Sequence, residues 1–259
     1  MIDLSFSDSE LEERRSTIAS FIEDSVAAAG ANGAILGLSG GIDSSLTAAL
    51  AVDALGTEGL QTVTMPAAVS DDRHLTDAIE LADQLGLSCD VLEIEDIVEE
   101  MVQTVPTTIG ERPRGNARAR TRAVLSYLLA NQDDLIVLGT GNRTEALIGY
   151  FTKYGDGAVD CHPIGNLYKC QVRQLARYVD VPDHIIDKTP TAELWADQTD
   201  EGELGIDYDT LDHILALHVD GPLSADATAA TLGCERRLVE QVDGLVAASA
   251  HKRAVPPSP

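Results

Sequence analysis

The sequence is short of positive charge, and of lysine above all. Its 259 residues carry 18 lysines and arginines against 43 aspartates and glutamates, which gives a formal net charge of −25, and only four of the basic residues are lysines. Such a surface repels nucleic-acid phosphates, so no nucleic acid is expected as a partner. The apolar periodicity described below argues against an acidic DNA mimic or a disordered tail. Carboxylates spread over helical faces, as in "DSELEER", instead suggest adaptation to high salt.

Long apolar runs and paired cysteines are also missing. The sequence contains no run of about 18 apolar residues, the length needed to span a bilayer. The chain opens on an acidic segment rather than a signal peptide. We therefore expect a cytoplasmic protein with no membrane partner. The four cysteines form no C-x-x-C pair, and Cys161, His162 and Cys170 lack a fourth zinc ligand at suitable spacing. Neither disulfides nor a thiolate metal site is expected.

Apolar patterns and turn residues predict alternating strands and helices. The predicted strands are 33–39, 60–66, 88–94 and 134–140. The predicted helices are 5–30, 44–55, 71–86 and 116–132, and a further acidic helix follows the third strand up to about Val102. Ser7 with Glu10, or Ser9 with Glu12, could form a capping box for the first helix. The alternation indicates an α/β fold, with an open, mostly parallel sheet flanked by helices on both faces. We expect a single domain, 1–259, mostly helical beyond Pro182, with a flexible proline-rich tail at about 254–259.

The stretch "LGLSGGIDSSLTAAL", residues 36–50, joins the first predicted strand to a helix. Free amides at a helix N-terminus bind phosphate. An ordinary tight turn would explain the glycines, but not three hydroxyl groups and an acid in seven residues. The two standard phosphate motifs are absent, because no lysine precedes Lys153 and the glycine spacing does not match G-x-G-x-x-G.

Residues 39–44, Ser-Gly-Gly-Ile-Asp-Ser, resemble the pyrophosphate-binding loop of N-type ATP pyrophosphatases. A second stretch, "LGTGNRTEALIGYFTKYGDG" at 138–157, follows the fourth predicted strand and should reach the same sheet edge. Together with 114–120, 162–178, 188–212 and 251–252, these segments resemble the NAD synthetase family in order and spacing, from about residue 15 to residue 253.

That resemblance implies an adenine nucleotide alpha hydrolase-like, Rossmann-like fold and a C–N bond-forming ligase. The implied reaction amidates deamido-NAD to NAD with ammonia, through an adenylated intermediate, releasing AMP and pyrophosphate. It also implies Mg²⁺ as the cofactor, ATP as a co-substrate and a homodimer with the dinucleotide site at its interface. Family members that use glutamine directly carry an additional amidohydrolase domain, for which this chain has no room.

The residue roles follow from the same resemblance. The ATP-binding positions would be Gly37, Leu38, Ser39, Gly40, Gly41, Ile42, Asp43, Ser44, Thr140, Lys169 and Thr191. The deamido-NAD positions would be Arg120, Lys153, Asp160, His251 and Lys252. Asp43 and Glu145 would hold Mg²⁺, as hard oxygen ligands. Asp43, Glu145, Lys169 and Asp156 are the catalytic candidates, with Asp156 or Asp160 proposed to deprotonate ammonium.

Three alternatives remain to be compared with this assignment. The arginines from Arg112 to Arg122 form either a solvated helical face or fixed donors to phosphate, and the second fits the chemistry better. At 100° per residue, Arg118 and Arg122 share a face while Arg120 points elsewhere. The rival enzymes of this fold are a tRNA-thiolating enzyme, which would need paired cysteines and a basic surface, and the synthetase half of GMP synthase. A non-catalytic nucleotide-binding module would not need both Asp43 and Glu145.

Overall fold

The centre of the protein is a four-stranded parallel sheet. The computed structural model describes residues 2–191, 194–195 and 198–258. The strands β1 (Gly33–Gly37), β2 (Leu60–Thr64), β3 (Cys89–Val91) and β4 (Leu135–Leu138) lie in the order β3-β2-β1-β4, and every neighbouring pair is parallel. The expected parallel sheet is therefore confirmed.

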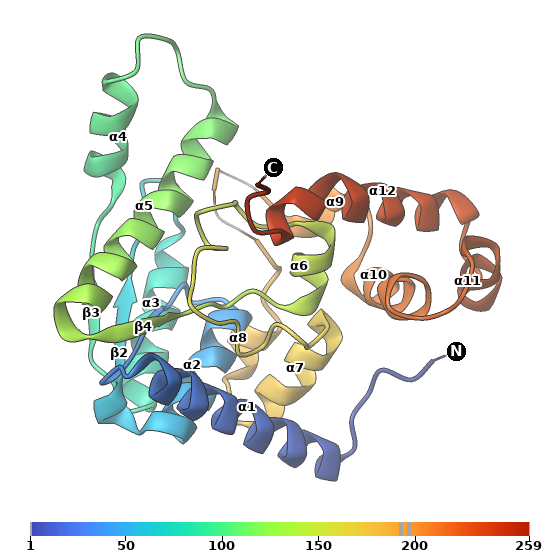
Figure 1. The fold of residues 1–259 in the computed structure, drawn as a ribbon, viewed down its shortest axis with the longest axis horizontal. Helices are drawn as coiled ribbons and strands as arrows, with labels where there is room; N and C mark the ends of the chain where they lie inside the picture. The colour runs from blue at the N-terminus through green and yellow to red at the C-terminus, as the bar shows by residue number, and fades with distance from the viewer. Residues whose placement is uncertain (1, 192–193, 196–197, 259) are drawn as a thin grey trace.

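Helices precede, connect and follow these strands (Figure 1). They are α1 (Asp8–Ala29), α2 (Ile42–Leu55), α3 (Asp72–Gln84), α4 (Glu95–Gln103), α5 (Glu111–Asp133), α6 (Arg143–Ile148), α7 (Lys169–Tyr178), α8 (Asp183–Ile186), α9 (Asp200–Leu204), α10 (Tyr208–Ile214), α11 (Ala225–Leu232) and α12 (Arg236–Arg253), with a 3₁₀-helix, η1 (Thr57–Gly59), and a π-helix, η2 (Leu215–Val219). Ser7 and Glu10 form the capping box of α1, and Gly30 ends this helix in the left-handed conformation.

Both faces of the sheet are covered, because successive strand residues point to opposite sides. Ala34 and Leu36 of β1 belong to one hydrophobic cluster, which also contains buried side chains of α1, α2, α3 and α7. Ile35, between them, belongs to a second cluster with Val137 and with Ala130 of α5. The doubly covered sheet explains why its strands read as continuous apolar runs.

The helix predicted for 116–132 begins five residues earlier, at Glu111, so the proline- and glycine-bearing connection was placed wrongly. Pro113 is the third residue of α5, where its missing N–H would have no helical partner in any case. Gly115 lies inside the helix for a packing reason, because a Cβ there would come within 2.8 Å of the Leu194 Cβ. The local sequence does not reveal this contact between distant segments.

The strand predicted for 88–94 is also shorter than expected, since β3 ends at Val91. The extended chain continues to follow its neighbour, with Leu92 N donating to Thr64 O at 2.9 Å and Ile94 N donating to Pro66 O at 3.1 Å. Pro66 has no N–H to return such a bond, so the regular ladder stops there.

The C-terminal part is helical, as expected, and builds its own apolar cluster. Buried side chains of α10 and α12, among them Tyr208, Leu211 and Val239, pack with Ile148 of α6 and Tyr168. Figure 1 shows α10, α11 and α12 gathered beside the sheet-bearing part of the chain. Ile148 is the last residue of α6, which follows β4, and Tyr168 immediately precedes α7. The cluster therefore fixes α12 relative to the segments that follow β4.

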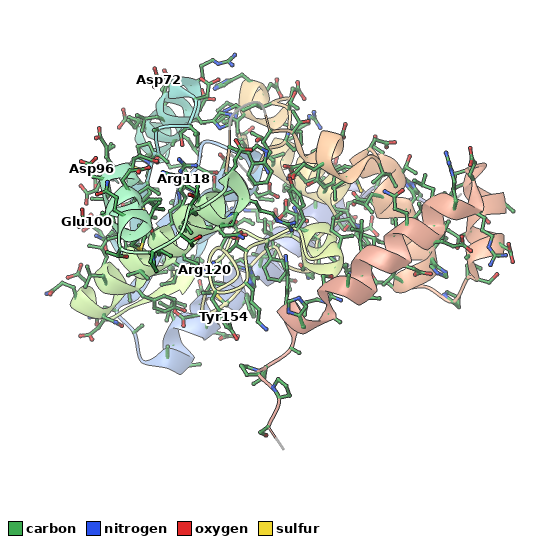
Figure 2. All side chains as sticks on the ribbon, turned by 90° about the horizontal axis from the view of Figure 1, so that it is seen from above. Asp72, Asp96, Glu100, Arg118, Arg120 and Tyr154 are labelled. Atoms are coloured by element: carbon green, nitrogen blue, oxygen red, sulfur yellow. The ribbon has the colours of Figure 1, made fainter. Side chains whose placement is uncertain are left out.

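The acidic side chains lie mainly at the surface. Asp72 of α3 and Asp96 and Glu100 of α4 are exposed and point away from the protein (Figure 2). Within the described ranges, no helix has both the length and the apolar character needed to cross a membrane.

We predict that added salt stabilises this protein. With 43 acidic against 18 basic residues, repulsion between surface carboxylates destabilises the folded state in dilute buffer, and ions screen it. The melting temperature should rise as KCl is increased to molar concentrations, measured by calorimetry at constant pH. A melting temperature that stays flat or falls over this range would contradict the proposed adaptation to salt.

Candidate functional site

The site lies where the order of the strands reverses. β1 is paired with β2 on one side and with β4 on the other, so the loops that follow β1 and β4 leave the same edge of the sheet. This edge is the usual ligand site of open parallel sheets. A cleft of about 420 Å³ opens there, which is large enough for a nucleotide-sized ligand.

The glycine loop after β1 supplies backbone donors at one end of the cleft. Gly41 caps the N-terminus of α2 without any side-chain hydrogen bond to the helix, so the first amides of α2 keep their donor capacity. Ser44 Oγ accepts from Ser39 N at 3.2 Å and lies 3.0 Å from Ser39 Oγ. All the predicted ATP-binding positions line the cleft except Gly40. An anion bound here would meet the positive end of the α2 dipole.

The loop after β4 brings Glu145 to the same place. Asn142 caps α6, with Glu145 N donating to Asn142 Oδ1 at 3.0 Å and Asn142 N donating to Glu145 Oε2 at 3.3 Å. Asn142 Nδ2 also donates to Asp43 Oδ1 at 2.9 Å. Asn142 is fully buried and links the two predicted metal ligands. The sequence analysis missed it, although the Asn-x-x-Glu capping box was a signal that could have identified it.

Lys169 lies between the two acids. Its side chain is only 2% exposed, and Nζ lies 2.5 Å from Asp43 Oδ2 and 3.3 Å from Glu145 Oε1. The ammonium also faces the ring of Tyr208, 5.2 Å from the centroid. The structure therefore brings together three of the predicted catalytic residues, which are up to 126 positions apart in the sequence.

This arrangement suits a divalent cation. Asp43 and Glu145 each place a carboxylate oxygen within contact distance of one positively charged atom, the Lys169 Nζ. Carboxylate oxygens are the ligands that Mg²⁺ prefers, and Mg²⁺ commonly uses one or two of them together with phosphate oxygens. The donor set thus fits the ion implied by the sequence.

Burial and neighbouring charges shift the pKa values of Glu145 and Lys169. Burial raises the pKa of Glu145, and the Asp43 carboxylate raises it further, while Lys169 opposes both effects. Burial alone would lower the pKa of Lys169, but Asp43 and Glu145 raise it above its usual value. The lysine is therefore a fixed positive charge at neutral pH.

A buried acid behind the site supports Lys169. Asp212 of α10 accepts from the Thr144 hydroxyl at 2.5 Å and from Cys170 N at 2.7 Å, while Lys169 N donates to Thr144 Oγ1 at 3.1 Å. Asp212 thus joins the first turn of α7 to α6. Sequence reasoning gave no role to this residue, which lies in a helical stretch with many other acids.

The predicted deamido-NAD residues divide into two groups. Lys252 lines the cleft, where its ammonium donates to Gly149 O at 2.6 Å and to Phe151 O at 2.7 Å. Arg120, Lys153 and His251 lie outside it but are joined to one another. Arg120 Nε donates to Lys153 O at 3.3 Å, and Lys153 Nζ donates to His251 O at 2.6 Å.

The two remaining acids differ in their availability. Asp156 lines the cleft and accepts from Thr152 N at 2.9 Å, and the surrounding protein raises its pKa by desolvation. Asp160 lies outside the cleft lining, and both of its carboxylate oxygens are engaged, by Val137 N at 2.7 Å and by the Tyr127 hydroxyl at 3.1 Å. Of these two acids, Asp156 therefore lines the cleft and Asp160 does not.

Only part of the arginine cluster on α5 is placed to meet a ligand in the cleft. Arg118 is buried and binds both oxygens of Glu95, at 2.8 and 3.0 Å, and donates to Leu194 O at 2.9 Å. Arg114 pairs with Glu99. Arg112 and Arg122 line the cleft, so only these two can face a ligand there. The acids of α4 bind Arg114 and Arg118, while Arg120 donates to Lys153 O, and helix periodicity cannot foresee these partners.

Described residues between Lys188 and Asp200 line one side of the cleft. Thr191, Leu194 and Trp195 line it, as does Asp200 at the start of α9. Residues 192–193 and 196–197, part of the stretch 188–212 that carries the family resemblance, lie outside the described residues. Trp195, which received no predicted contact, is thus placed at the wall of the cleft.

All four cysteines are free, and none lines the cleft. Burial raises the pKa of Cys89 and of Cys161, and burial together with Asp212 raises that of Cys170 to about 12. These thiols are therefore poorly suited to be nucleophiles at neutral pH.

Comparison with known proteins relates this site to one family. Residues 15–256 match the family described as NAD synthase. A protein of Halobacterium salinarum named NH(3)-dependent NAD(+) synthetase is 58% identical over 259 residues, which cover 100% of this chain and 97% of the relative. Two solved structures each cover 98% of this chain and 99% of their own. They are an NMN synthetase from Francisella tularensis (35% identical, TM-score 0.84) and an NH3-dependent NAD synthetase from Campylobacter jejuni (28% identical, TM-score 0.82).

We predict that both acids are needed for ATP cleavage. Asp43→Asn and Glu145→Gln each remove an anionic oxygen ligand, and a bound cation contributes several kcal/mol at such a site. Each variant should release pyrophosphate at least roughly 100-fold more slowly, measured with ATP, Mg²⁺, ammonium and deamido-NAD. The circular dichroism spectrum should stay native. Near-normal turnover by either variant would rule out the metal assignment.

Proposed function

The chain belongs to the NAD synthase family, and we propose that the cleft between β1 and β4 is where it amidates deamido-NAD to NAD with ATP and ammonia. The activity is that of an ATP-dependent, C–N bond-forming ligase. The observation that carries the assignment to this cleft is the meeting of Asp43, Glu145 and Lys169 beside an uncapped helix N-terminus. The two acids supply the ligands for a cation, and the helix supplies donors for phosphate.

The reaction needs positioning and charge neutralisation more than a protein nucleophile. A nicotinate oxygen of deamido-NAD forms a bond to the α-phosphorus of ATP while the bond to pyrophosphate breaks. Ammonia then forms the amide bond and AMP leaves with the former carboxylate oxygen. Holding the reactants in line and neutralising the pyrophosphate charge lowers the barrier to the first step.

The residues of the cleft fit these tasks. We assign the pyrophosphate to the loop 37–44 and Mg²⁺ to Asp43 and Glu145, where the ion would neutralise phosphate charge. Lys169, fixed between the acids, keeps a positive charge beside the phosphates. Thr140 and Thr191 line the cleft and are assigned to ATP. Asp156 is the carboxylate assigned to accept a proton from ammonium, because it faces the cleft.

We place the rest of the dinucleotide on the face formed by Arg120, Lys153 and His251. This face also carries exposed apolar side chains. Val124 and Leu128 follow Arg120 at intervals of four residues along α5 and are 67% and 63% exposed. Tyr154, 58% exposed, stacks with the Lys153 ammonium and lies beside Arg120 in Figure 2.

A homodimer would cover this face. Residues 120, 124 and 128 lie on one side of a helix, and two exposed apolar residues together with an aromatic ring mark a surface suited to a partner. A second copy packed here would bury Val124 and Leu128 and bring the Arg120 group close to the interface. We therefore propose the dimer and the dinucleotide site as parts of one surface. No membrane or nucleic-acid partner is proposed, and a cytoplasmic location stays a prediction.

The nitrogen donor should be ammonia. Glutamine hydrolysis needs an activated nucleophile, and the thiols at Cys89, Cys161 and Cys170 have raised pKa values. Purified protein with Mg²⁺, ATP and deamido-NAD should give NAD by mass spectrometry with ammonium, and only background NAD with glutamine freed of ammonium. Glutamine turnover that matched ammonium and disappeared in Cys161→Ser would contradict this prediction.

The same assay identifies the nucleotide substrate. Because one similar structure is an NMN synthetase, nicotinic acid mononucleotide is the competing substrate to include. Deamido-NAD should have the higher kcat/KM, and Arg120→Ala should reduce it for deamido-NAD alone. Preferential use of the mononucleotide would contradict the proposed substrate.

The dimer is tested by charge placed on the apolar face. Leu128→Glu would bury a charge at the interface, so it should shift the protein from dimer to monomer in light scattering after gel filtration. Val255→Glu is the matched control, since Val255 is 86% exposed in the C-terminal tail. A wild-type monomer, or a Leu128→Glu dimer of unchanged affinity, would remove α5 from the proposed interface.

A further inference from the structure

We propose that Lys188 is a positioning residue of the phosphate-binding loop, holding the Gly40 carbonyl outward so that the Gly41 amide faces the cleft. Asp77 of α3 holds Lys188 in this position. The inference rests on the proposed function, because it assigns Lys188 to the binding of the ATP phosphates. No role for Lys188 followed from the sequence, where it is one of only four lysines.

The contacts place Lys188 between two distant segments. Its Nζ donates to Gly40 O at 2.8 Å and forms an ion pair with Asp77. The side chains of Lys188 and Asp77 are 20% and 13% exposed, so water only partly screens the pair. Lys188 itself lines the cleft, together with Thr191 and Trp195, so its bond to Gly40 O joins this wall of the cleft to the glycine loop.

The loop needs such a contact because its own sequence does not fix the peptide between Gly40 and Gly41. Gly40 has φ +73°, and a Cβ at this position would lie 2.1 Å from His74 O. Two successive glycines accept many backbone conformations, so either orientation of the peptide between them is accessible. The Gly40 carbonyl and Gly41 N–H of a trans peptide point in opposite directions.

The orientation of this peptide decides whether the loop attracts or repels phosphate. Ser39 and Gly41 line the cleft, whereas Gly40 does not, and the Gly41 N–H donates to Ser39 Oγ at 3.3 Å. Lys188 holds the Gly40 carbonyl, so the partly negative carbonyl oxygen stays away from a bound phosphate. In the opposite orientation, this carbonyl would face the phosphates.

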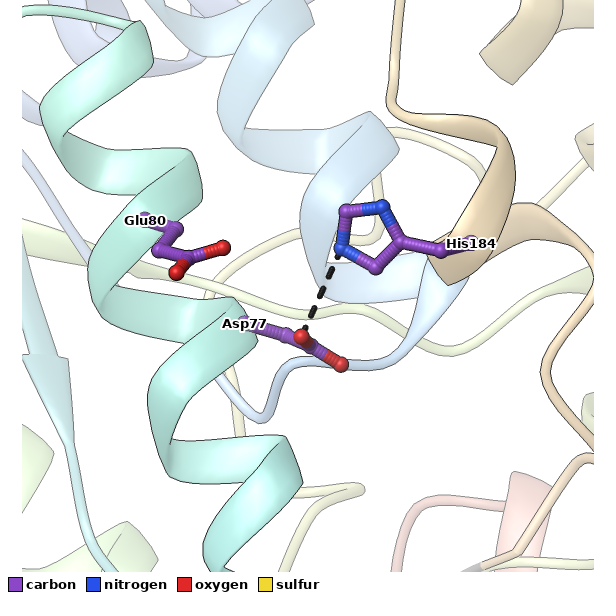
Figure 3. A group of neighbouring side chains, drawn as sticks. All are labelled: Asp77, Glu80 and His184. Carbon is purple, nitrogen blue, oxygen red and sulfur yellow. Dashed lines mark ion pairs between the residues drawn. The ribbon is translucent and has the colours of Figure 1, made fainter.

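Asp77 is held in turn from α8. His184 Nε2 lies 3.4 Å from Asp77 Oδ1, and Figure 3 shows the imidazole facing Asp77, with Glu80 one turn further along α3. The three side chains are close enough to suggest a metal site. Glu80 and His184 are exposed and Asp77 is paired with Lys188, so we assign this group to holding Lys188.

The test separates a positioning role from direct contact with phosphate. Lys188→Met should raise the KM for Mg-ATP about tenfold while the KM for deamido-NAD stays within about twofold, because a uniform binding interaction is lost. Lys188→Arg should restore most of the affinity. Arg177→Met, which removes an exposed ion pair with Asp187 nearby, is the matched control and should change neither constant.

Asp77→Asn decides between the two roles. If Asp77 holds Lys188 in place, this variant should raise the KM for Mg-ATP about threefold. If Lys188 binds phosphate directly, removing the competing carboxylate should lower that KM and overturn the proposal. A KM for Mg-ATP within twofold of wild type in Lys188→Met would also overturn it. Calorimetric Mg-ATP affinities of the same variants test the loop even if deamido-NAD proves not to be the substrate.

Discussion

The parallel pairing of β1 with β4 is the constraint on which the site depends. The two strands are neighbours with Ala34 opposite Ile136, although about a hundred residues separate them. Parallel neighbours end at the same edge of a sheet, so Asp43 after β1 and Glu145 after β4 reach one place. Asn142 then joins them directly, through its contacts with Asp43 and with the Glu145 backbone.

The buried ammonium of Lys169 makes this arrangement electrostatically possible. Burial raises the pKa of Glu145, and repulsion from the nearby Asp43 carboxylate raises it further. Lys169 offsets the repulsion and keeps the oxygens directed at one point. Its own position depends on α7, which Asp212 anchors from the C-terminal helices through Cys170 N. The helical part of the chain thus takes part in building the proposed metal site.

The proposed dinucleotide surface depends on the same helical part. α12 carries Lys252 and His251 to the segment after α6, where Lys252 holds Gly149 O and Phe151 O, and Lys153 reaches His251 O. The cleft and the outer face are therefore connected by short contacts. Arg120, Val124 and Leu128 extend this face along α5, so binding of the dinucleotide and association of two chains would stabilise one another.

The local sequence was sufficient for those features that depend on near neighbours. Alternating apolar segments indicated the parallel α/β fold, Ser7 with Glu10 was one of two predicted caps of the first helix, and residues 39–44 predicted a phosphate-binding loop after β1. The resemblance to a family supplied the distant partners Glu145 and Lys169, which no local pattern connects to Asp43. The tertiary structure alone decided which arginines of α5 are available, because Glu95 and Glu99 from another helix bind Arg118 and Arg114. It likewise revealed Asn142, Asp212 and Lys188, whose partners lie 42 to 148 residues away. A residue's type and spacing limit what its side chain can do, but its partners are chosen by packing between segments that the linear sequence keeps apart.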